Sequence, residues 1–476
     1  MESYIFFKVF TYNGLMTKRI PPAENQALCL APWTHTYLSP QGERRFCCAS
    51  RESSVFHKQY IDLPGQEELQ ATFEPQSLEQ HWNSERMKAI RTKMMSGQIP
   101  KECQVCHEQQ LVLTPYKDYF NKTLFPHLLD EIYQHTDDEG TTTLKPRSFD
   151  YRFSNSCNFK CRMCSDNFSS AWEEEKREHG LLFPENDRWL LPEVKKEIAR
   201  FNNEVASGEF EEAIEKGEVE EIYWVGGEPL IWARHWKTME SLIESGQAHK
   251  VFVRYNSNLS QVSWKGRHLF RDILPHFKGY TVAASIDGSG KIGEFIRTGL
   301  DWNLWLDNFK SGLPFVEERG LDSLVMDVTL TLPGLFSLVD LLKTANELKV
   351  KMYVKIVFAY DPSILLSPFA LPRNILHPFL DDLMAECFPL INSSTNELFK
   401  TLQEMKRRPT FQEQYPNWEK GFIEGRDYLQ KIAKIRGDGT EGRLSIEKIY
   451  SARRDVLDWW QSHPSSILEE KLTRKS

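Results

Sequence analysis

The chain has 476 residues and a net charge of −8, and 40% of its residues are hydrophobic and 26% charged, which is ordinary for a globular protein of two or three domains. No apolar run is long enough to span a membrane, and the N-terminal YIFFKVF is too short for a secretory signal and is interrupted by Lys8, so the protein is expected to be cytoplasmic. The acidic excess argues against a protein that grips duplex phosphates, although it leaves nucleic acid open as a substrate.

The first predicted region, residues 1–110, is rich in cysteine and contains a helix that ends at SGQIP, with Met16 as a second possible start of the protein. Five of the nine cysteines lie here: Cys29, Cys47, Cys48, Cys103 and Cys106. Because disulfides are rare in the cytosol, thiols grouped in this way indicate ligands of a metal ion or cluster. Four thiolates can complete the coordination of an iron–sulfur cluster, which suits electron transfer or structure, and the same arrangement also fits a zinc ribbon.

A connector, residues 111–148, follows, and then a region of alternating strands and helices, residues 149–370. Six strand candidates are spaced through it: SFDYRFSN, EEIYWVGG, KVFVRYNSN, GYTVAASID, LVMDVTLTL and KMYVKIVF. Amphipathic helical patterns lie between most of them, which predicts a parallel sheet with helices outside, a partial (β/α)6 barrel of the TIM type. In such a fold the chemistry lies at the carboxyl ends of the strands.

The last predicted region, residues 371–476, is helical, with patterns such as NELFKTLQEMKRR interrupted by the flexible RGDGTEGR. Cys387 lies in an apolar helical context, and we expect it to be a buried hydrophobic residue rather than a ligand. The predicted fold class is therefore α/β, with a cysteine-rich module in front of the barrel and a helical region behind it.

Three cysteines follow the first strand of the predicted barrel, in FSNSCNFKCRMCSD. Cys157, Cys161 and Cys164 have the spacing C-x3-C-x2-C, which places three soft thiolates on one compact loop. Such ligands suit an iron–sulfur cluster better than a hard cation. A fully ligated cubane needs four thiolates, so three leave one iron open to a ligand that is not protein, as catalytic zinc sites leave one position open.

At these residues the sequence resembles the radical S-adenosylmethionine (SAM) enzymes, whose hallmark is a C-x3-C-x-Φ-C loop after the first strand of a partial barrel. The resemblance implies a [4Fe–4S] cluster on the three cysteines, with an open iron that chelates the amino and carboxylate groups of SAM. It further implies reductive cleavage of SAM to a 5′-deoxyadenosyl radical, which abstracts hydrogen from a substrate. The electron would come from a flavodoxin- or ferredoxin-type reductant.

The resemblance also implies SAM contacts at the ends of later strands, in WVGGEP, RYNSN, ASIDG and FIRTG. The two glycines of WVGGEP would let the backbone approach the ligand closely, and the carboxylate of Glu228 would meet the methionine ammonium. Ser257 and Asn258 match ribose contacts, and Ser285 matches a contact to the methionine carboxylate or nearby groups. Met163 stands where the family usually has an aromatic residue and would contact adenine through its backbone. The implied SAM contacts are Met163, Gly226, Gly227, Glu228, Ser257, Asn258, Ser285 and, more weakly, Arg297.

The front region resembles the SPASM and twitch modules of radical SAM proteins, which carry auxiliary [4Fe–4S] clusters. CLAPW, the step from Gly42 to Cys47 and the helix before PKECQVC match the module. Here the module precedes the barrel and has cysteines for one cluster, which fits the reduced, twitch-like form. The glycine spacing favours Cys47 over Cys48 as a ligand, and a structural zinc site remains the alternative. The implied ligands are Cys29, Cys47, Cys103 and Cys106.

Several other polar and aromatic residues lie near these motifs. His35 and His107 are possible substitute ligands, but each is predicted to be a polar surface residue, and Trp33 is predicted to pack beside the metal site. No catalytic acid or base is assigned. Alternation along the strands places four side chains in the barrel interior: Tyr151, Arg152, Tyr223 and Arg254.

Because SPASM and twitch enzymes mostly modify peptides or proteins, the resemblance implies a peptide or protein substrate from which hydrogen is abstracted. Two alternatives remain open: radical modification of a nucleotide, a nucleic-acid base or a small-molecule precursor, and a non-catalytic iron–sulfur scaffold protein. An intact GGEP element beside the three cysteines argues against the scaffold. The choice of substrate class rests on analogy with other proteins that carry the module, and no substrate-binding residue has been identified in the sequence.

Overall fold

The computed structural model describes residues 19–50, 75–104, 106, 116–182, 188–357, 364–416 and 418–462. Met16 and His107, singled out above, lie outside the described residues. None of the helices within these ranges combines the length and the apolar character needed to cross a membrane.

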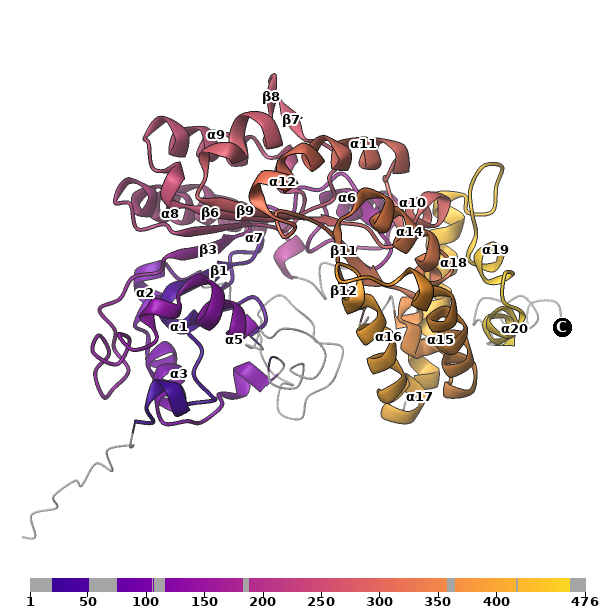
Figure 1. Ribbon diagram of the computed structural model, residues 1–476, viewed down its shortest axis with the longest axis horizontal. Coiled ribbons are helices and arrows are strands. Elements are labelled where there is room, and N and C mark those ends of the chain that lie inside the picture. Colours follow the sequence, from indigo (N-terminus) through magenta and orange to yellow (C-terminus); the bar gives the residue numbers. More distant parts are fainter. Residues whose placement is uncertain are drawn as a thin grey trace, which may run out of the picture.

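Eight strands form one sheet in the order β12-β11-β9-β6-β5-β3-β1-β2 (Figure 1). All six strands predicted from the sequence are present: β3 (Ser148–Tyr151), β5 (Glu221–Trp224), β6 (Phe252–Ser257), β9 (Gly279–Ser285), β11 (Leu324–Leu330) and β12 (Lys351–Ile356). Each pairs in parallel with its neighbours among the six. The prediction of an α/β fold around a parallel sheet is confirmed.

The sheet continues into the cysteine-rich N-terminal region. Strand β1 (His35–Leu38) pairs in parallel with β3, so that His35 lies opposite Ser148, and β2 (Arg44–Arg45) pairs antiparallel with β1. Among the described residues β12 and β2 are the two edges of the sheet, which is therefore open rather than closed into a barrel. The front region and the predicted barrel thus share one sheet.

Helices cover the upper face of the sheet in Figure 1, with α9 and α11 above the strands. In α9, Trp236, Met239 and Leu242 recur at helical spacing and are buried in the main core, which also holds Val253 and Tyr255 of β6. The helices of this region are α6 (Ser170–Glu178), α7 (Pro192–Arg200), α8 (Ser207–Glu215), α9 (Ala233–Glu244), α10 (Gly290–Ile296), α11 (Trp302–Gly312), α12 (Val316–Arg319), α13 (Leu332–Leu335) and α14 (Leu338–Leu348).

The N-terminal region lies below the sheet and has a hydrophobic core of its own (Figure 1). Serine side chains cap two of its helices: Ser77 forms a capping box with Gln80, and Ser84 accepts from the Met87 N–H. Its helices are α1 (Ala31–Thr34), α2 (Leu78–Trp82), α3 (Glu85–Met95) and α5 (Tyr116–Asp118). The segment expected to be a connector contributes Phe120, Phe125, Leu128, Ile132 and Leu144 to this core.

The C-terminal region is helical where the structure describes it, as predicted. Helix α16 contacts the edge strand β12, where the Val354 N–H donates to Glu397 Oε1 at 3.2 Å. Cys387 is completely buried at the end of α15, as expected. The helices are α15 (Arg373–Cys387), α16 (Asn396–Arg407), α17 (Phe411–Gln414), α18 (Trp418–Arg436), α19 (Ile446–Tyr450) and α20 (Arg454–Ser462).

Candidate cofactor site

The loop after β3, which we call the cluster loop, comprises residues 152–169 and carries the three cysteines. Its strand β4 (Lys160–Cys161) pairs antiparallel with β10 (Arg297–Thr298), so that Cys161 lies opposite Arg297. The Cys164 N–H donates to the Cys161 carbonyl at 2.9 Å, and the Cys157 N–H donates to Ser170 Oγ at 3.2 Å. The loop is therefore held by β10 on one side and by the start of α6 on the other.

The thiols of the cluster loop are free and largely buried. Burial raises the pKa of all three thiols. The neighbouring Cys161 raises the pKa further at Cys157 and Cys164, whereas the Arg297 guanidinium, 4.0 Å from the Cys161 Sγ, opposes the rise at Cys161. The three thiols are therefore held protonated in the protein alone, and a metal cluster would bind them with release of these protons.

No three His, Cys, Asp or Glu side chains among the described residues converge closely enough to hold a single metal ion. The ligands of an iron–sulfur cubane differ from such a group, because each thiolate binds a different iron atom. The three thiols of one short loop remain chemically suited to a cluster of this kind.

Glu228, at the end of the turn after β5, lies beside the cluster loop and is 1% exposed. Its carboxylate accepts from Ser257 Oγ (2.8 Å), from the Asn258 N–H (2.6 Å) and from the Leu230 N–H (3.0 Å). The Asn258 amide group in turn approaches the Cys157 Sγ at 4.0 Å. Burial raises the pKa of Glu228 from 4.5 to about 7. The structure thus brings Glu228, Ser257 and Asn258 together beside Cys157. The sequence singles out these three residues in two separate motifs.

The glycines of WVGGEP are needed for contact between this turn and the cluster loop. Gly227 has a φ of +57°, and a Cβ atom there would lie 2.3 Å from the Ser156 carbonyl oxygen. The same carbonyl accepts the Glu228 N–H at 2.8 Å. A Cβ atom on Gly226 would lie 2.7 Å from the Arg152 side chain. The space that the glycines leave is therefore occupied by the chain itself, and it fixes the position of Glu228.

Arg297 is tied to the end of β9 through a buried ion pair. Its guanidinium contacts both carboxylate oxygens of Asp287, at 2.7 and 3.0 Å, and Asp287 also accepts the Thr329 N–H at 3.0 Å. Ser285 lies two residues earlier, with its Oγ 3.5 Å from Asp327 Oδ2. Met163 is half buried against the main core. Arg297 therefore lies at the cysteines, whereas Ser285 belongs to a neighbouring polar network.

This network runs across the face of the sheet opposite the helices, and no sequence motif indicated it. Lys355 contacts Asp327 (2.6 Å), Asn256 donates to Asp327 (2.7 Å), and the Tyr223 hydroxyl donates to Asn256 (2.6 Å). The guanidinium of Arg254 lies 3.7 Å from the centre of the Tyr223 ring. The signal in the sequence that could have indicated this network was strand alternation. The Tyr255 hydroxyl contacts His235 of helix α9, so the neighbouring side chains of Arg254 and Asn256 point to the opposite face of the sheet.

Of the four side chains placed in the interior by alternation, Tyr223 and Arg254 belong to the polar network. Arg152 makes two hydrogen bonds to Asp150, each 3.0 Å, and lies over the Tyr37 ring. The Tyr151 ring is buried against Phe210, and its hydroxyl accepts from Arg44. Tyr151 therefore packs in the main core and does not face the polar network.

The prediction that His35 is a surface residue is wrong. His35 is 2% exposed, and its Nδ1 lies 2.6 Å from Ser148 Oγ. Burial lowers its pKa to about 3. The cause is the pairing of β1 with β3, which makes a short polar segment part of the sheet.

The front cysteines gather at the core of the N-terminal region, together with the fully buried Trp33. Burial raises the pKa of Cys29 to about 12, with Cys106 as a further cause. The hydrogen bond with Cys48 and burial raise the pKa of Cys47, and the nearby Cys29 raises it further. Cys48 instead has Asp150 and Arg152 among its charged neighbours. Cys29 therefore has both Cys47 and Cys106 nearby, whereas Cys48 lies beside Cys47 and also near the charges of Asp150 and Arg152. Cys103 ends a short 3-10 helix (Lys101–Cys103) at the edge of the same core.

Comparison with protein families gives a match to this front region. A family model named SPASM, described as an iron–sulfur cluster-binding domain, matches residues 29–107. No curated protein matches the chain. The matched residues begin at Cys29 and include all five front cysteines, so the similarity supports a cluster-binding module there and favours iron–sulfur over zinc.

Proposed function

We propose that the protein is a radical SAM enzyme in which residues 152–169 hold the SAM-binding cluster. The observation that carries the proposal is the meeting of Glu228, Ser257 and Asn258 with Cys157 at the carboxyl ends of parallel strands. The similarity of residues 29–107 to an iron–sulfur cluster-binding domain supports it independently, because such domains generally accompany radical SAM enzymes.

The residues at the site have separable roles under this proposal. Cys157, Cys161 and Cys164 would hold a [4Fe–4S] cluster, and the chemistry that this cluster would supply is the one-electron reduction of SAM. Glu228 is already held by three donors and binds the methionine ammonium with its remaining acceptor positions. Ser257 and Asn258 orient Glu228 as well as the ribose. Arg297 places a positive charge beside Cys161.

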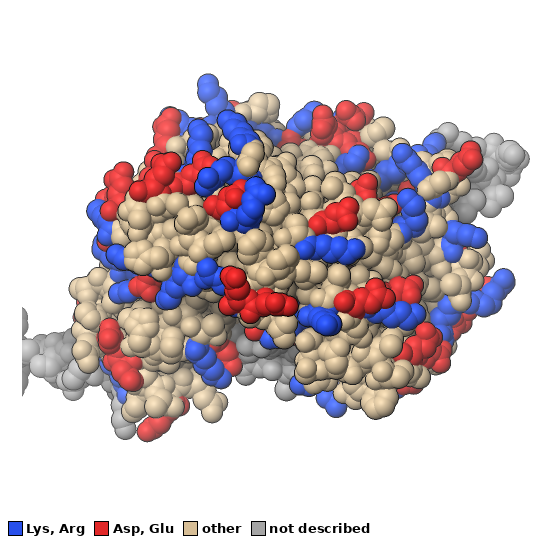
Figure 2. Space-filling view, turned by 45° about the horizontal axis from the view of Figure 1, so that its top comes forward, with Lys and Arg blue, Asp and Glu red and all other residues tan. Residues whose placement is uncertain are grey.

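A second cluster on Cys29, Cys47, Cys103 and Cys106 would relay electrons or help to seat the substrate. We propose a peptide or protein substrate, in keeping with the front module, and a flavodoxin- or ferredoxin-type reductant. On the face shown in Figure 2, Lys and Arg are interspersed with Asp and Glu rather than gathered into a basic stripe, so that face offers no surface for a nucleic-acid backbone. The polar network around Asp327 and Lys355 would face the substrate.

The test is to purify the protein anaerobically, reconstitute it and measure iron, sulfide and zinc per chain. We expect about eight iron in the wild type and about four in a Cys157→Ala/Cys161→Ala/Cys164→Ala variant, since each cubane holds four. Cys387→Ala is the control and should keep the wild-type iron content, because Cys387 is a buried residue of α15 and belongs to neither group of cysteines. With dithionite and SAM, only proteins that keep the three cysteines should form 5′-deoxyadenosine. Wild-type protein without iron, or without this product, would contradict the proposal.

A further inference from the structure

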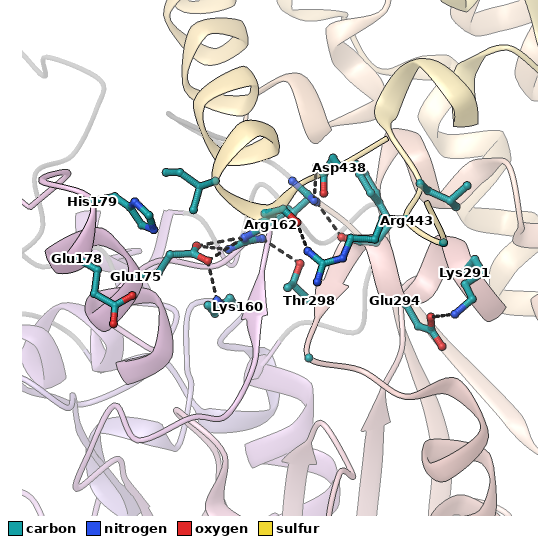
Figure 3. Close-up of a pocket in the computed structure, with 16 residues that line it drawn as sticks. Lys160, Arg162, Glu175, Glu178, His179, Lys291, Glu294, Thr298, Asp438 and Arg443 are labelled. Atoms are coloured by element: carbon teal, nitrogen blue, oxygen red, sulfur yellow. Dashed lines mark hydrogen bonds and ion pairs between the residues drawn. The ribbon is translucent and has the colours of Figure 1, made fainter. Parts of the chain in front are cut away.

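A cavity of about 440 Å³ lies behind the cluster loop, between β4, β10, α6 and the end of α18 (Figure 3). Charged side chains line much of it, and the buried ones are paired with one another in its wall. Glu175 pairs with Arg436, and Arg162 pairs with Asp438; all four side chains are at most 8% exposed. Because these buried charges pair with one another, the wall is a contact between two parts of the chain rather than a ligand-binding site. We call this contact, made by Glu175, Arg436, Arg162 and Asp438, the joint.

Arg436, the last residue of α18, reaches both strands of the β4–β10 pair. Its guanidinium donates to Glu175 Oε2 at 2.7 and 3.1 Å and to Thr298 Oγ1 at 3.0 Å. Glu175 also accepts from Lys160 at 2.6 Å. Through Thr298 of β10 and Lys160 of β4, the C-terminal region therefore holds the ribbon that carries Cys161 (Figure 3).

A second path leads from Arg436 to the backbone of Cys161. The guanidinium lies 4.3 Å from the centre of the Trp172 ring. The indole N–H of Trp172 donates to the Cys161 carbonyl at 2.7 Å. Arg436 thus holds the Trp172 ring, which in turn holds the backbone of Cys161. These contacts add to those that Arg436 makes with side chains of the ribbon.

Asp438, two residues further along, holds the other side of the ribbon. It accepts from Arg162 at 2.6 Å, and the Arg162 side chain also donates to the Phe295 carbonyl at 2.8 Å. The Arg162 backbone N–H continues the pairing of the ribbon by donating to the Ile296 carbonyl at 2.8 Å. The loop of Asp438 is itself fixed to the helix end, because Arg443 donates to the Arg436 carbonyl.

Strand alternation connects this joint to the proposed SAM site. Neighbouring side chains of a strand point to opposite faces, and Lys160 and Thr298 line the cavity. Cys161 and Arg297, their neighbours in the ribbon, therefore point away from the cavity, and they approach each other at 4.0 Å. The ribbon is the wall between the joint and the cysteines, so a displacement of the ribbon moves Cys161 and Arg297 together.

We propose that Arg436 and Asp438 are positioning residues, which hold the β4–β10 ribbon from behind so that Cys161 and Arg297 keep their places at the cofactor site. The inference rests on the proposed function for the role of the site, but the contacts that it invokes exist without a cofactor. It assigns to the C-terminal region a task in cofactor binding, carried out by residues about 270 positions away from the cysteines that they serve.

The first arm of the test uses the protein without cluster and measures the alkylation rate of each cysteine by mass spectrometry. Cys161 is 9% exposed, and in Arg436→Met we expect it to be alkylated at least about tenfold faster than in wild type, because loss of one partner of a buried ion pair favours local opening. Arg436→Lys should restore most of the protection, and Asp438→Asn should give an intermediate rate. The rate at Cys387 in the same samples should not change.

The control is Arg453→Met, the same substitution at a more exposed ion pair. Arg453 also makes an ion pair, with Asp382 at 2.6 Å, and lies over an aromatic ring, Phe379, at 4.7 Å, but it does so elsewhere in the C-terminal region. We expect wild-type protection of Cys161 in this variant. Equal alkylation rates in wild type and Arg436→Met, or the same acceleration in Arg453→Met, would overturn the proposal.

The second arm uses the reconstituted protein and measures the change in the electron paramagnetic resonance spectrum of the reduced cluster on addition of SAM. Only a cluster with an open iron responds to SAM, so this change reports the cluster loop even when a second cluster is present. We expect a reduced or absent response in Arg436→Met, partial rescue in Arg436→Lys and a wild-type response in Arg453→Met. A wild-type protein that shows no response would contradict the proposed function, whereas the alkylation arm would still decide the role of Arg436.

Discussion

The buried carboxyl group of Glu228 leads to a prediction in which stability and SAM binding change in opposite directions. Burial raises its pKa from 4.5 to about 7, although its hydrogen bonds lower it. Between these two pH values the folded protein binds more protons than the unfolded chain, so the stability contributed by this group is present at low pH and is lost as the pH rises. Ionised Glu228 at pH 8 thus costs the fold roughly 3 kcal/mol compared with an unperturbed carboxyl group.

The variant Glu228→Gln removes the charge and keeps the shape. Its amide oxygen can still accept from Ser257 and Leu230, which both contact Oε1, but its amide nitrogen would face the Asn258 N–H. The lost hydrogen bond costs about 1–2 kcal/mol. Without SAM we therefore expect the variant to be about 1–2 kcal/mol more stable than wild type at pH 8, and less stable than wild type at pH 5.

Urea unfolding followed by tryptophan fluorescence at both pH values measures the first effect, and equilibrium dialysis of SAM against reconstituted protein measures the second. We expect SAM to bind at least about tenfold more weakly to the variant, because a hydrogen bond between two charged groups is lost. The exposed Glu318→Gln is the control and should change neither quantity. A stability difference that is the same at pH 5 and pH 8, or an unchanged SAM affinity, would refute the reasoning.

Two further predictions concern stability alone. Gly227→Ala should lower the free energy of unfolding in urea by about 2 kcal/mol more than Gly246→Ala does. Both residues have positive φ, but only at Gly227 would the new methyl group meet a backbone oxygen. Equal losses of stability would show that the contact with Ser156 relaxes easily. His81 is buried, burial lowers its pKa to about 3, and within the described part of the chain neither ring nitrogen has a hydrogen-bond partner. The unfolded state therefore binds the extra proton as the pH falls below about 6.5, and His81→Leu should reduce the loss of stability between pH 7 and pH 5 by about 2 kcal/mol; an unchanged pH dependence would contradict this.

The parts of the fold that the sequence predicts are those encoded by neighbouring residues. Each of the six parallel strands is a continuous apolar or alternating run, and the three cysteines and GGEP are short segments whose spacing carries their meaning. Glu228, Ser257 and Asn258 could be placed at one edge of the sheet because parallel strands share their carboxyl ends. The structure brings these three residues together, because local patterns and sheet geometry are sufficient to place them, and their role toward SAM stays a prediction.

The parts that the sequence does not predict depend on contacts between distant segments. The four residues of β1 are too short and too polar to indicate a strand, so their place beside β3, and with it the burial of His35, becomes visible only in three dimensions. Arg436 contacts Glu175 across 261 positions, and nothing in RGDGTEGR indicates this partner. Side chains such as Lys355 and Asp327 are also uninformative singly, because their role depends on which strands become neighbours.

The pairing of β1 with β3 has a consequence for the synthesis of the protein. Strand β1 leaves the ribosome about 110 residues before the strand that covers its parallel edge, which corresponds to roughly 5–20 s at ordinary rates of translation. During this time its one partner among the strands that the structure describes is the two-residue β2. Exposed strand edges attract other chains, so the nascent N-terminal region would benefit from chaperones or from early metal loading. A truncated chain that stops before β3 should aggregate, even though it contains the complete set of front cysteines.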